Sequence, residues 1–214
     1  MKAYFISGLA AGSGVFRNIK LPAGFESVYL DWIPHQKNES LAHYAMRMAE
    51  KIQTAEPFIL IGLSFGGMLA TEIAKRYKPV ATIIIASVPL SSQIPRYYKL
   101  AGKLQLHKLV PASLAKSTAI ARRFFNVETA EDKKMLDDII STTDIPFTRW
   151  GMDAILKWNN NEVPAPVWHI HGTADRILPV KYTNPTHTLI GSGHMMVVNR
   201  GIEISRILGE ILVI

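Results

Sequence analysis

Cysteine is missing from this sequence of 214 residues, which excludes disulfide bridges, thiolate metal sites and a cysteine nucleophile. No apolar run reaches the length that spans a membrane. The first residues lead directly into an apolar, strand-like run and show no signal-peptide pattern with a cleavage site. Together these absences favour a soluble protein of the cytoplasm that makes no stable insertion into a membrane.

Acidic residues are scarce relative to basic ones, at 17 Asp and Glu against 24 Lys and Arg, so the formal net charge is +7. The excess is concentrated in residues 91–123, which contain seven basic residues and no acidic one. Such a stretch is typical of a solvated helix face, and the alternative is a surface that attracts an anionic substrate or membrane. No nucleic-acid-binding motif accompanies the charge, so DNA and RNA are not expected partners.

Apolar residues make up 48% of the chain, which is enough for the large core of one domain. Helical patterns, among them residues 41–53, 68–77 and 202–212, separate most of the strand-like runs, and Ser40 is a plausible N-cap for the first of them. The predicted strands are residues 3–7, 27–30, 58–61, 80–86, 167–171 and 186–190. This alternation predicts an α/β fold with a doubly wound, mostly parallel sheet of about six strands, in which ligands bind at the carboxyl ends of the strands.

One long block interrupts the alternation of strands and helices. Between residues 90 and 163 the sequence shows only amphipathic helical patterns, at residues 97–109, 111–125, 130–140 and 147–158. Because this block enters after one strand and leaves before the next, it is predicted to be an insertion that lies over the strand ends. We therefore expect a core of residues 1–89 and 164–214 and a helical cap or lid of residues 90–163.

A serine framed by glycines lies where a predicted strand passes into a predicted helix. Gly62, Ser64 and Gly66 form a Gly-x-Ser-x-Gly pattern, which at such a junction is typical of a nucleophile elbow. The turn crowds the residues two before and two after the serine, so both positions must lack a side chain. The alternative is a tight turn in which Ser64 merely caps a helix. The flanking strand and helix favour Ser64 as a covalent nucleophile.

A serine hydroxyl is a poor nucleophile at neutral pH, so it needs a base within reach and an acid that orients this base. Asp175 lies just after a predicted strand, in His171-Gly172-Thr-Ala-Asp175, and is the candidate acid. His194 follows the last strand in a glycine-rich loop and is the candidate base. The alternatives are an ordinary turn aspartate and an ordinary loop histidine.

These three motifs, in the order Ser64, Asp175, His194, resemble the α/β-hydrolase superfamily over nearly the whole chain. The resemblance implies a serine hydrolase with a helical cap insertion and an active site formed by these three residues. It further implies an oxyanion hole formed by the backbone N–H groups of Leu9 and Phe65, with Ala10 as the alternative to Leu9. The chain begins directly on the strand that carries the oxyanion loop, which predicts a minimal six-stranded sheet.

Other candidate sites are weaker. His169 and His171 share one face of a strand near Asp175, but a satisfied pair is favoured over a metal site, and no metal is expected. The glycines of residues 8–14 do not complete a dinucleotide-binding pattern, so no cofactor is expected. Trp150 is the candidate substrate contact within the helical block, although aromatic residues there more often belong to a core. The remaining histidines are interpreted as surface or structural residues: His35, His43, His107 and His187.

The sequence thus predicts a serine hydrolase that cleaves a small, mostly apolar carboxylic ester or thioester through an acyl-enzyme on Ser64. Two alternatives stay open, a carbon–carbon bond hydrolase or perhydrolase with the same triad, and a hydrolase-like receptor or scaffold without activity. The expected partner is a small-molecule acyl substrate, and a homodimer is compatible with the sequence.

Overall fold

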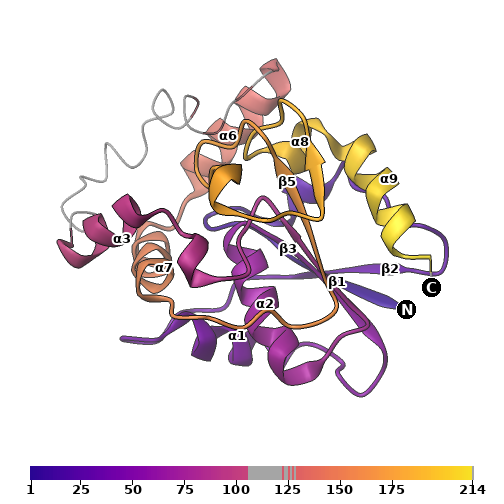
Figure 1. Ribbon diagram of the computed structural model, residues 1–214, viewed down its shortest axis with the longest axis horizontal. Coiled ribbons are helices and arrows are strands. Elements are labelled where there is room, and N and C mark those ends of the chain that lie inside the picture. The colour runs from indigo at the N-terminus through magenta and orange to yellow at the C-terminus, as the bar shows by residue number, and fades with distance from the viewer. Residues whose placement is uncertain (106–121, 123–124, 126, 128, 214) are drawn as a thin grey trace.

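The computed structural model describes residues 1–105, 122, 125, 127 and 129–213, and its strands form a single six-stranded sheet (Figure 1). The strands are β1 (Lys2–Ile6), β2 (Glu26–Leu30), β3 (Phe58–Leu63), β4 (Ala81–Ile85), β5 (Val167–Gly172) and β6 (His187–Leu189). Every neighbouring pair is parallel and the spatial order is β2-β1-β3-β4-β5-β6. The predicted doubly wound parallel sheet is therefore confirmed, with its order reversing between β1 and β3.

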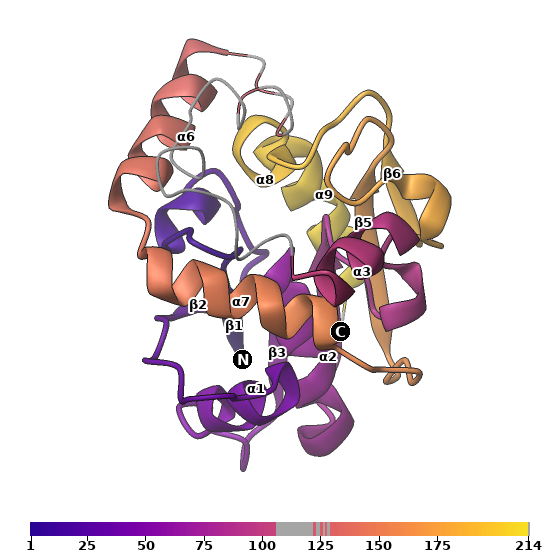
Figure 2. The same ribbon diagram turned by 90° about the vertical axis from the view of Figure 1, so that its left-hand side faces the viewer.

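Helices cover both faces of this sheet (Figures 1 and 2). One face carries α1 and α2, and the other carries α8 and α9. The described residues of the block between β4 and β5 form three further helices, α3, α6 and α7. The bounds are α1 (Leu41–Ala49), α2 (Phe65–Tyr77), α3 (Arg96–Lys103), α6 (Ala130–Thr142), α7 (Ile145–Lys157), α8 (Met196–Asn199) and α9 (Gly201–Ile211), with short 3₁₀ turns η1 (Ser13–Phe16), η2 (Ser91–Gln93) and η4 (Val180–Tyr182).

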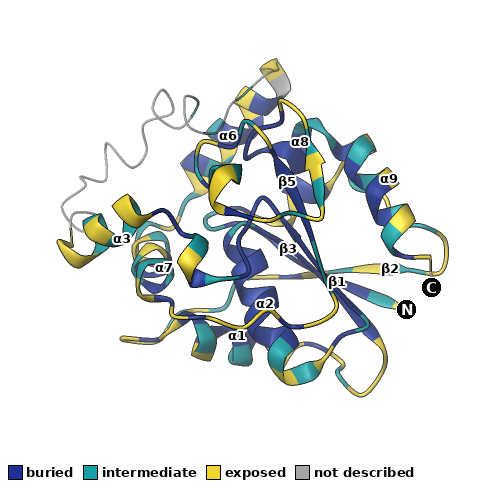
Figure 3. Ribbon diagram, in the orientation of Figure 1, coloured by how far each residue is buried: buried dark blue, intermediate teal, exposed yellow. Residues whose placement is uncertain are grey.

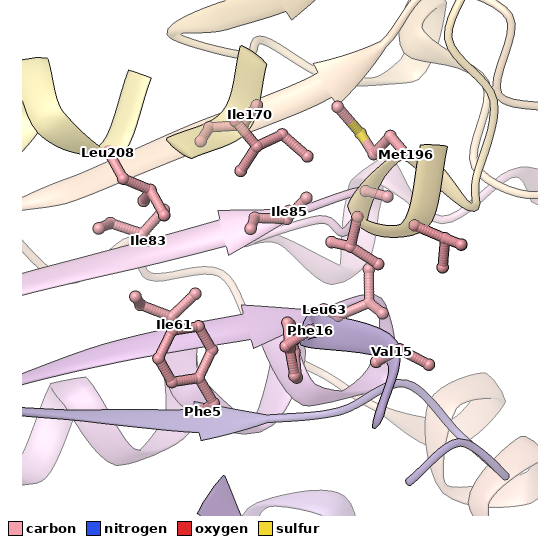
Figure 4. Close-up of a cluster of buried hydrophobic side chains, with 14 of the residues drawn as sticks. Phe5, Val15, Phe16, Ile61, Leu63, Ile83, Ile85, Ile170, Met196 and Leu208 are labelled. Carbon is pink, nitrogen blue, oxygen red and sulfur yellow. The ribbon is translucent and has the colours of Figure 1, made fainter. Parts of the chain in front are cut away.

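The inner strands β1, β3 and β4 are buried on both faces, so their sequences are nearly continuous apolar runs, whereas the edge strand β2 is largely exposed (Figure 3). Alternate residues point to opposite faces. On β3, Ile59 and Ile61 face the cluster that includes Leu208 of α9 and Met196 of α8, which Figure 4 shows. Leu60 lies in the other cluster, with the apolar faces of α1 and α2. The sheet is thus the middle layer of three.

Helix boundaries differ from the predicted ones where local hydrogen bonds decide them. Ser40 caps α1 as predicted, because its hydroxyl accepts a hydrogen bond from the His43 N–H (3.2 Å). The helix ends at Ala49, four residues before the predicted end. There the chain tightens into a turn, with Lys51 N–H donating to the Met48 carbonyl (3.1 Å). Within the ranges that the structure describes, no helix is both long and apolar enough to cross a membrane.

The block between β4 and β5 begins and ends at one place. Asn160 is 3% exposed, and its side-chain amide donates to the Pro89 carbonyl (2.7 Å). The Asn160 carbonyl in turn accepts from the Ser91 N–H (2.9 Å) and the Ser91 hydroxyl (3.0 Å). These hydrogen bonds therefore hold together the two ends of the block, where the chain leaves the sheet after β4 and returns before β5. The helix predicted over residues 111–125 lies largely outside the described residues.

Helices of this block extend both layers of the core. Met135, Leu136 and Ile140 of α6 belong to the cluster shared with α8 and α9. Trp150 and other buried residues of α7 belong to the cluster shared with α1 and α2. In Figure 1, α3 and α7 lie at the end of the sheet opposite the N-terminus, where the parallel strands have their carboxyl ends.

We predict that Ile61→Ala, in the middle of β3, lowers the free energy of unfolding by about 2–5 kcal/mol, because it removes buried methyl groups and leaves a cavity. Urea denaturation followed by circular dichroism measures this loss. Ile190→Ala is the matched control, since Ile190 is 82% exposed, and its effect should stay within about 0.5 kcal/mol. Equal losses in the two variants would contradict this assignment of the core.

Candidate active site

Ser64 forms the sharp turn between β3 and α2, beside the point where the strand order reverses. Its backbone angles are φ 51° and ψ −115°, and a positive φ is uncommon for a residue with a side chain. The Ser64 N–H donates to the Ile85 carbonyl (2.9 Å), and the Ser64 carbonyl accepts from the Gly67 N–H (2.9 Å). The side chain remains only half-buried. A strained, hydrogen-bonded turn of this kind fixes the direction of the hydroxyl.

The glycines on either side of Ser64 are required by close backbone contacts. A Cβ atom on Gly62 would lie 2.4 Å from the Gly66 carbonyl oxygen. A Cβ atom on Gly66 would lie 2.2 Å from the Ile6 carbonyl oxygen of β1. Both distances are far below van der Waals contact, so a side chain at either position would push α2 away from the sheet.

The structure brings Ser64, His194 and Asp175 into one hydrogen-bonded chain. The Ser64 Oγ lies 2.9 Å from His194 Nε2, and His194 Nδ1 lies 2.7 Å from Asp175 Oδ2. His194 is 6% exposed and Asp175 is 4% exposed. Because the carboxylate only accepts, His194 carries its proton on Nδ1, which leaves the Nε2 lone pair for the serine hydroxyl.

Asp175 stays ionised although it is buried. Burial alone raises the pKa of this carboxyl, but the interaction with His194 and the hydrogen bonds to the carboxylate together hold the pKa below its usual value. Asp175 Oδ1 accepts from the backbone N–H groups of Ile177 (2.8 Å) and Leu178 (2.9 Å). One oxygen is therefore fixed by the turn that follows, and the other is directed at His194.

Hydrogen bonds join the loops that carry Asp175 and His194. The Ala174 N–H donates to the Ser192 carbonyl (2.9 Å), and the Gly191 N–H donates to the Thr173 hydroxyl (2.8 Å). Gly172 permits this approach, since a Cβ atom there would lie 2.2 Å from the Ser192 carbonyl oxygen. The ends of β5 and β6 are thus held together, and this sets the separation of Asp175 and His194.

The block between β4 and β5 also reaches His194. The Phe125 ring meets the His194 imidazole edge-on, with centroids 5.7 Å apart and planes inclined by 69°. An apolar ring against the imidazole lowers the local dielectric constant and excludes water from one side of it. Phe125 ends the helical pattern predicted over residues 111–125, and this pattern gives no sign of a contact with His194.

A family model described as a thioesterase domain matches residues 16–149, which is more than half of the chain. The chain belongs to the thioesterase domain family. The match includes the turn at Ser64 and ends before β5, so Asp175 and His194 lie outside the matched range. Membership of this family, together with the fold, makes the protein an ester-hydrolysing α/β-hydrolase, and the resemblance seen in the sequence is confirmed.

Solved structures share the fold of this thioesterase-family protein at low sequence identity. A thermophilic esterase from Thermogutta terrifontis, with malate bound, superposes with a TM-score of 0.77 at 13% identity, covering 99% of this chain and 89% of the other. The hydrolase olei00960 from Oleispira antarctica gives a TM-score of 0.74 at 15% identity and covers 97% and 89%. A lipase-esterase related protein from Clostridium acetobutylicum gives 0.71 at 13% identity and covers 97% and 92%. A search of curated protein sequences found no match.

The two predicted oxyanion donors, the N–H groups of Leu9 and Phe65, belong to segments next to Ser64 in the thioesterase-family fold. Phe65 is the first residue of α2, so its N–H has no partner within the helix. Leu9 lies in a tight turn closed by a hydrogen bond from the Ala11 N–H to the Gly8 carbonyl (2.9 Å). A Cβ atom on Gly8 would lie 3.6 Å from the Ser64 Cβ, so this turn borders the nucleophile. Assignment of Leu9 and Phe65 as donors stays a prediction.

Trp150, the predicted substrate contact, is packed into the core of the family fold. It is 9% exposed, its indole N–H donates to the Glu39 carbonyl (2.9 Å), and its ring lies 4.5 Å from that of Tyr44. It also meets Phe65, the neighbour of Ser64, edge-on at 6.0 Å. Trp150 therefore supports the residue that follows the nucleophile, and direct contact with substrate stays a prediction.

His169 and His171 form a pair, with His169 Nε2 2.9 Å from His171 Nδ1. Among the described residues, no three His, Asp or Glu side chains are grouped as a metal site. Burial and, to a smaller extent, the neighbouring His171 together lower the pKa of His169 to about 3. Other histidines have structural contacts, namely His35 with Trp150, His43 with Glu39 and His187 with Thr186, while His107 lies outside the described residues.

Ser87 supports the turn at Ser64 by a hydrogen bond, a contact that was not predicted from the sequence. This fully buried side chain donates a hydrogen bond to the Ser64 carbonyl (2.6 Å). Its hydroxyl occupies the space beside Gly67, where a Cβ atom would lie 2.5 Å away. A serine directly after a predicted strand was the only signal in the sequence, and it does not indicate which distant carbonyl the hydroxyl reaches.

We predict that the free energy of unfolding falls by about 2–3 kcal/mol between pH 6.5 and pH 4.5 through His169 alone. The folded protein keeps His169 neutral, whereas the unfolded chain protonates it below pH 6.5, so acid favours unfolding. This contribution is present above pH 6.5 and is lost as the pH falls towards about 3. Urea denaturation at several pH values measures it.

In the variant His169→Gln, the loss of stability over this range should be smaller by about the same amount, because the titrating group is gone. The control His187→Gln, on the neighbouring strand β6, should keep the full dependence. Asp175 does not interfere, since its pKa is lowered from 3.8 and its contribution is lost only at more acid pH. Identical pH dependences in all three proteins would contradict the prediction.

Proposed function

We propose that this protein is a serine hydrolase that cleaves a small, mostly apolar carboxylic ester or thioester through an acyl-enzyme on Ser64. The observation that carries the proposal is the 2.9 Å separation of Ser64 Oγ and His194 Nε2, within a chain that continues to the ionised Asp175. Membership of the thioesterase domain family supports the same bond type. A general base must be this close to the proton that it removes.

In the first half of the proposed reaction, Ser64 Oγ attacks the carbonyl carbon of the substrate while His194 Nε2 takes the hydroxyl proton. The ionised Asp175 stabilises the imidazolium that forms. The carbonyl oxygen becomes an oxyanion and accepts hydrogen bonds from the backbone N–H groups of Leu9 and Phe65. The tetrahedral intermediate then collapses, the bond from carbon to the leaving oxygen or sulfur breaks, and His194 returns the proton to the leaving group.

In the second half, water replaces the leaving group. His194 Nε2 accepts a proton from this water, whose oxygen attacks the acyl carbon of the ester on Ser64. The same oxyanion donors stabilise the second tetrahedral intermediate. Its collapse breaks the bond to Ser64 Oγ, which regains its proton from His194, and releases the carboxylic acid. The cycle consumes one water and uses no cofactor.

The proposed preference for an apolar acyl group rests on the side chains around Ser64. Leu63 and Phe65 precede and follow it, and both are buried. The Phe125 ring contacts the His194 ring, and Met195 follows His194 in the sequence and is buried. Apolar side chains beside a bound acyl chain remove its surface from water.

We predict that a fluorophosphonate probe labels the wild-type protein at Ser64, because the activated hydroxyl attacks phosphorus and stays bound to it. The variant Ser64→Ala should not be labelled, and its kcat for p-nitrophenyl butyrate should fall on the order of 10⁴-fold or more. Mass spectrometry locates the adduct. Ser92→Ala is the matched control, since Ser92 is an exposed serine outside the site, and it should keep full labelling and activity.

An unlabelled but folded wild-type protein would overturn the proposal and favour a hydrolase-like scaffold. The bond type is resolved by turnover of p-nitrophenyl esters and acyl-CoA thioesters of increasing chain length, compared with a vinylogous diketone. Hydrolysis of esters or thioesters supports the proposal. Cleavage of the diketone alone would replace it with carbon–carbon bond hydrolysis by the same residues.

We further predict that Asp175→Asn lowers kcat on the order of 10³- to 10⁴-fold with little change in KM, because the amide removes the charge and permits the wrong imidazole tautomer. Steady-state kinetics on the best ester measure this effect. Asp153→Asn is the matched control, since Asp153 lies on the surface side of α7 with its carboxylate 2.6 Å from Lys157 Nζ. Equal activity of the two variants would contradict the role assigned to Asp175.

A further inference from the structure

Two imidazoles lie buried behind the proposed catalytic acid, and the reaction described above does not use them. His169 and His171 project from the same face of β5 and are 3% and 0% exposed. Burying a titratable ring is costly unless its polar atoms are hydrogen-bonded. The arrangement of these hydrogen bonds assigns the pair a role.

The hydrogen bonds determine where each ring carries its proton. His171 Nε2 lies 2.7 Å from the Leu178 carbonyl oxygen, which only accepts, so Nε2 must carry the proton. The lone pair of a neutral His171 is then on Nδ1, where it accepts from His169 Nε2 at 2.9 Å. The second nitrogen of His169, Nδ1, is then a lone pair; it is buried and makes no hydrogen bond of acceptable geometry, although the Ser87 backbone acts on the ring as the smallest of three effects on the His169 pKa. The two hydrogen bonds of His171 thus favour two neutral rings of the Nε2–H tautomer.

His171 contacts the turn of Asp175 at two points. The Leu178 N–H donates to Asp175 Oδ1 (2.9 Å), and the Leu178 carbonyl accepts from the His171 N–H. The imidazole therefore stabilises the residue that holds the carboxylate. His171 Nε2 also lies 3.5 Å from Asp175 Oδ2. This is the carboxylate oxygen that accepts from His194 Nδ1. One N–H of His171 therefore faces both the turn and the oxygen that orients the proposed base.

We propose that His171, held in its Nε2–H tautomer by His169, is a positioning residue that keeps Asp175 Oδ2 directed at His194. The role rests on the proposed function, since it acts through the triad and touches no substrate. A tilt of the carboxylate would lengthen its bond to His194 and weaken the stabilisation of the imidazolium. Small displacements of this kind are costly, because catalysis depends on positions within a fraction of an ångström.

The neutral state of His171 is part of the proposal. A protonated His171 would compete with His194 for the charge of Asp175, and its Nδ1–H would point at the Nε2–H of His169. Burial lowers the pKa of His171, against the opposing effects of Asp175 and the Leu178 carbonyl. Among the described residues, the titratable groups that act on His171 are Asp175 and His194. The Tyr98 phenol of α3 interacts with Asp175, and its pKa is raised to about 12 mainly by burial and also by Tyr97 and Asp175.

The test compares two substitutions of His171, of which one keeps a hydrogen-bond donor and the other does not. In His171→Gln, the side-chain amide nitrogen replaces Nε2 and keeps a donor for the Leu178 carbonyl, whereas His171→Leu has none. We expect His171→Leu to lower kcat about 10- to 100-fold with KM within about twofold. Its acid limb of kcat/KM should shift to lower pH, because a misdirected carboxylate stabilises the protonated base less. His171→Gln should keep kcat within about threefold of the wild-type value and leave the acid limb in place.

The matched control is His187→Leu, on the neighbouring strand β6, which should leave both kcat and the pH profile unchanged. A folded His171→Leu with the wild-type kcat and pH profile would overturn the proposal. A loss of kcat without any shift of the acid limb, not rescued by Gln, would also overturn it and leave His171 a structural residue. Because His169 acts through His171, adding His169→Leu to His171→Leu should cause no further loss of kcat. Independent, additive losses of kcat would contradict the proposed action of His169 through His171.

The tautomers are tested without any activity, in the wild-type protein. Nitrogen-15 NMR of labelled histidine should show both rings as neutral Nε2–H tautomers from about pH 5 to about pH 8. An Nδ1–H tautomer of His171, or protonation of either ring with a midpoint near the ordinary 6.5, would overturn the proposal. Because this measurement uses the wild-type protein, it tests the proposal even if His171→Leu does not fold. Failure of fluorophosphonate labelling, by contrast, would refute the proposed function and leave the tautomer assignment standing.

Discussion

The close approach of α2 to the sheet at Ser64 is the constraint on which the rest of the site depends. Gly66 lies against the Ile6 carbonyl of β1, and Gly62 lies against the Gly66 carbonyl, so the helix can begin only where neither position has a side chain. This contact allows the positive φ of Ser64, and it places the first N–H of α2 beside the turn that follows β1. The cost of that strained conformation is offset by the buried hydrogen bonds to Ile85 and from Ser87.

Asp175 and His194 are positioned by contacts between the loops that follow β5 and β6, at the same edge of the sheet as Ser64. Gly172 allows the loop after β5 to meet the Ser192 carbonyl, so the loops of Asp175 and His194 behave as one unit. Since β4 lies between β3 and β5, the distance from this unit to Ser64 is set by two strand spacings. Parallel sheet geometry and the contacts of Gly62, Gly66 and Gly172 thus determine the separation of Ser64, Asp175 and His194. His171 adds a hydrogen bond to the Leu178 carbonyl, in the turn that follows Asp175.

Local motifs explain why so much of this arrangement could be predicted from the sequence. Ser64, Asp175 and His194 each follow a strand, and all carboxyl ends of a parallel sheet meet at one edge, so their proximity follows from topology. Ser87 and Asn160 could not be predicted in this way. Each acts by a hydrogen bond between segments more than twenty residues apart, and a serine or an asparagine in a loop carries no sign of its partner. The end of α1 was placed too late for a related reason, since the helical pattern continues where the backbone already turns.

The packing of α7 limits how a substrate can reach Ser64. Trp150 and Trp158 anchor this helix to the core, and the Trp158 indole donates to the buried carboxylate of Glu72 (2.7 Å). Each buried indole contributes about 4–6 kcal/mol by its area alone, and withdrawing Trp158 would also deprive a buried carboxylate of a partner. Displacing α7 would therefore cost a large share of the stability that a domain of this size has. A substrate of the proposed reaction must therefore reach Ser64 with α7 in place, although this helix belongs to the block between β4 and β5.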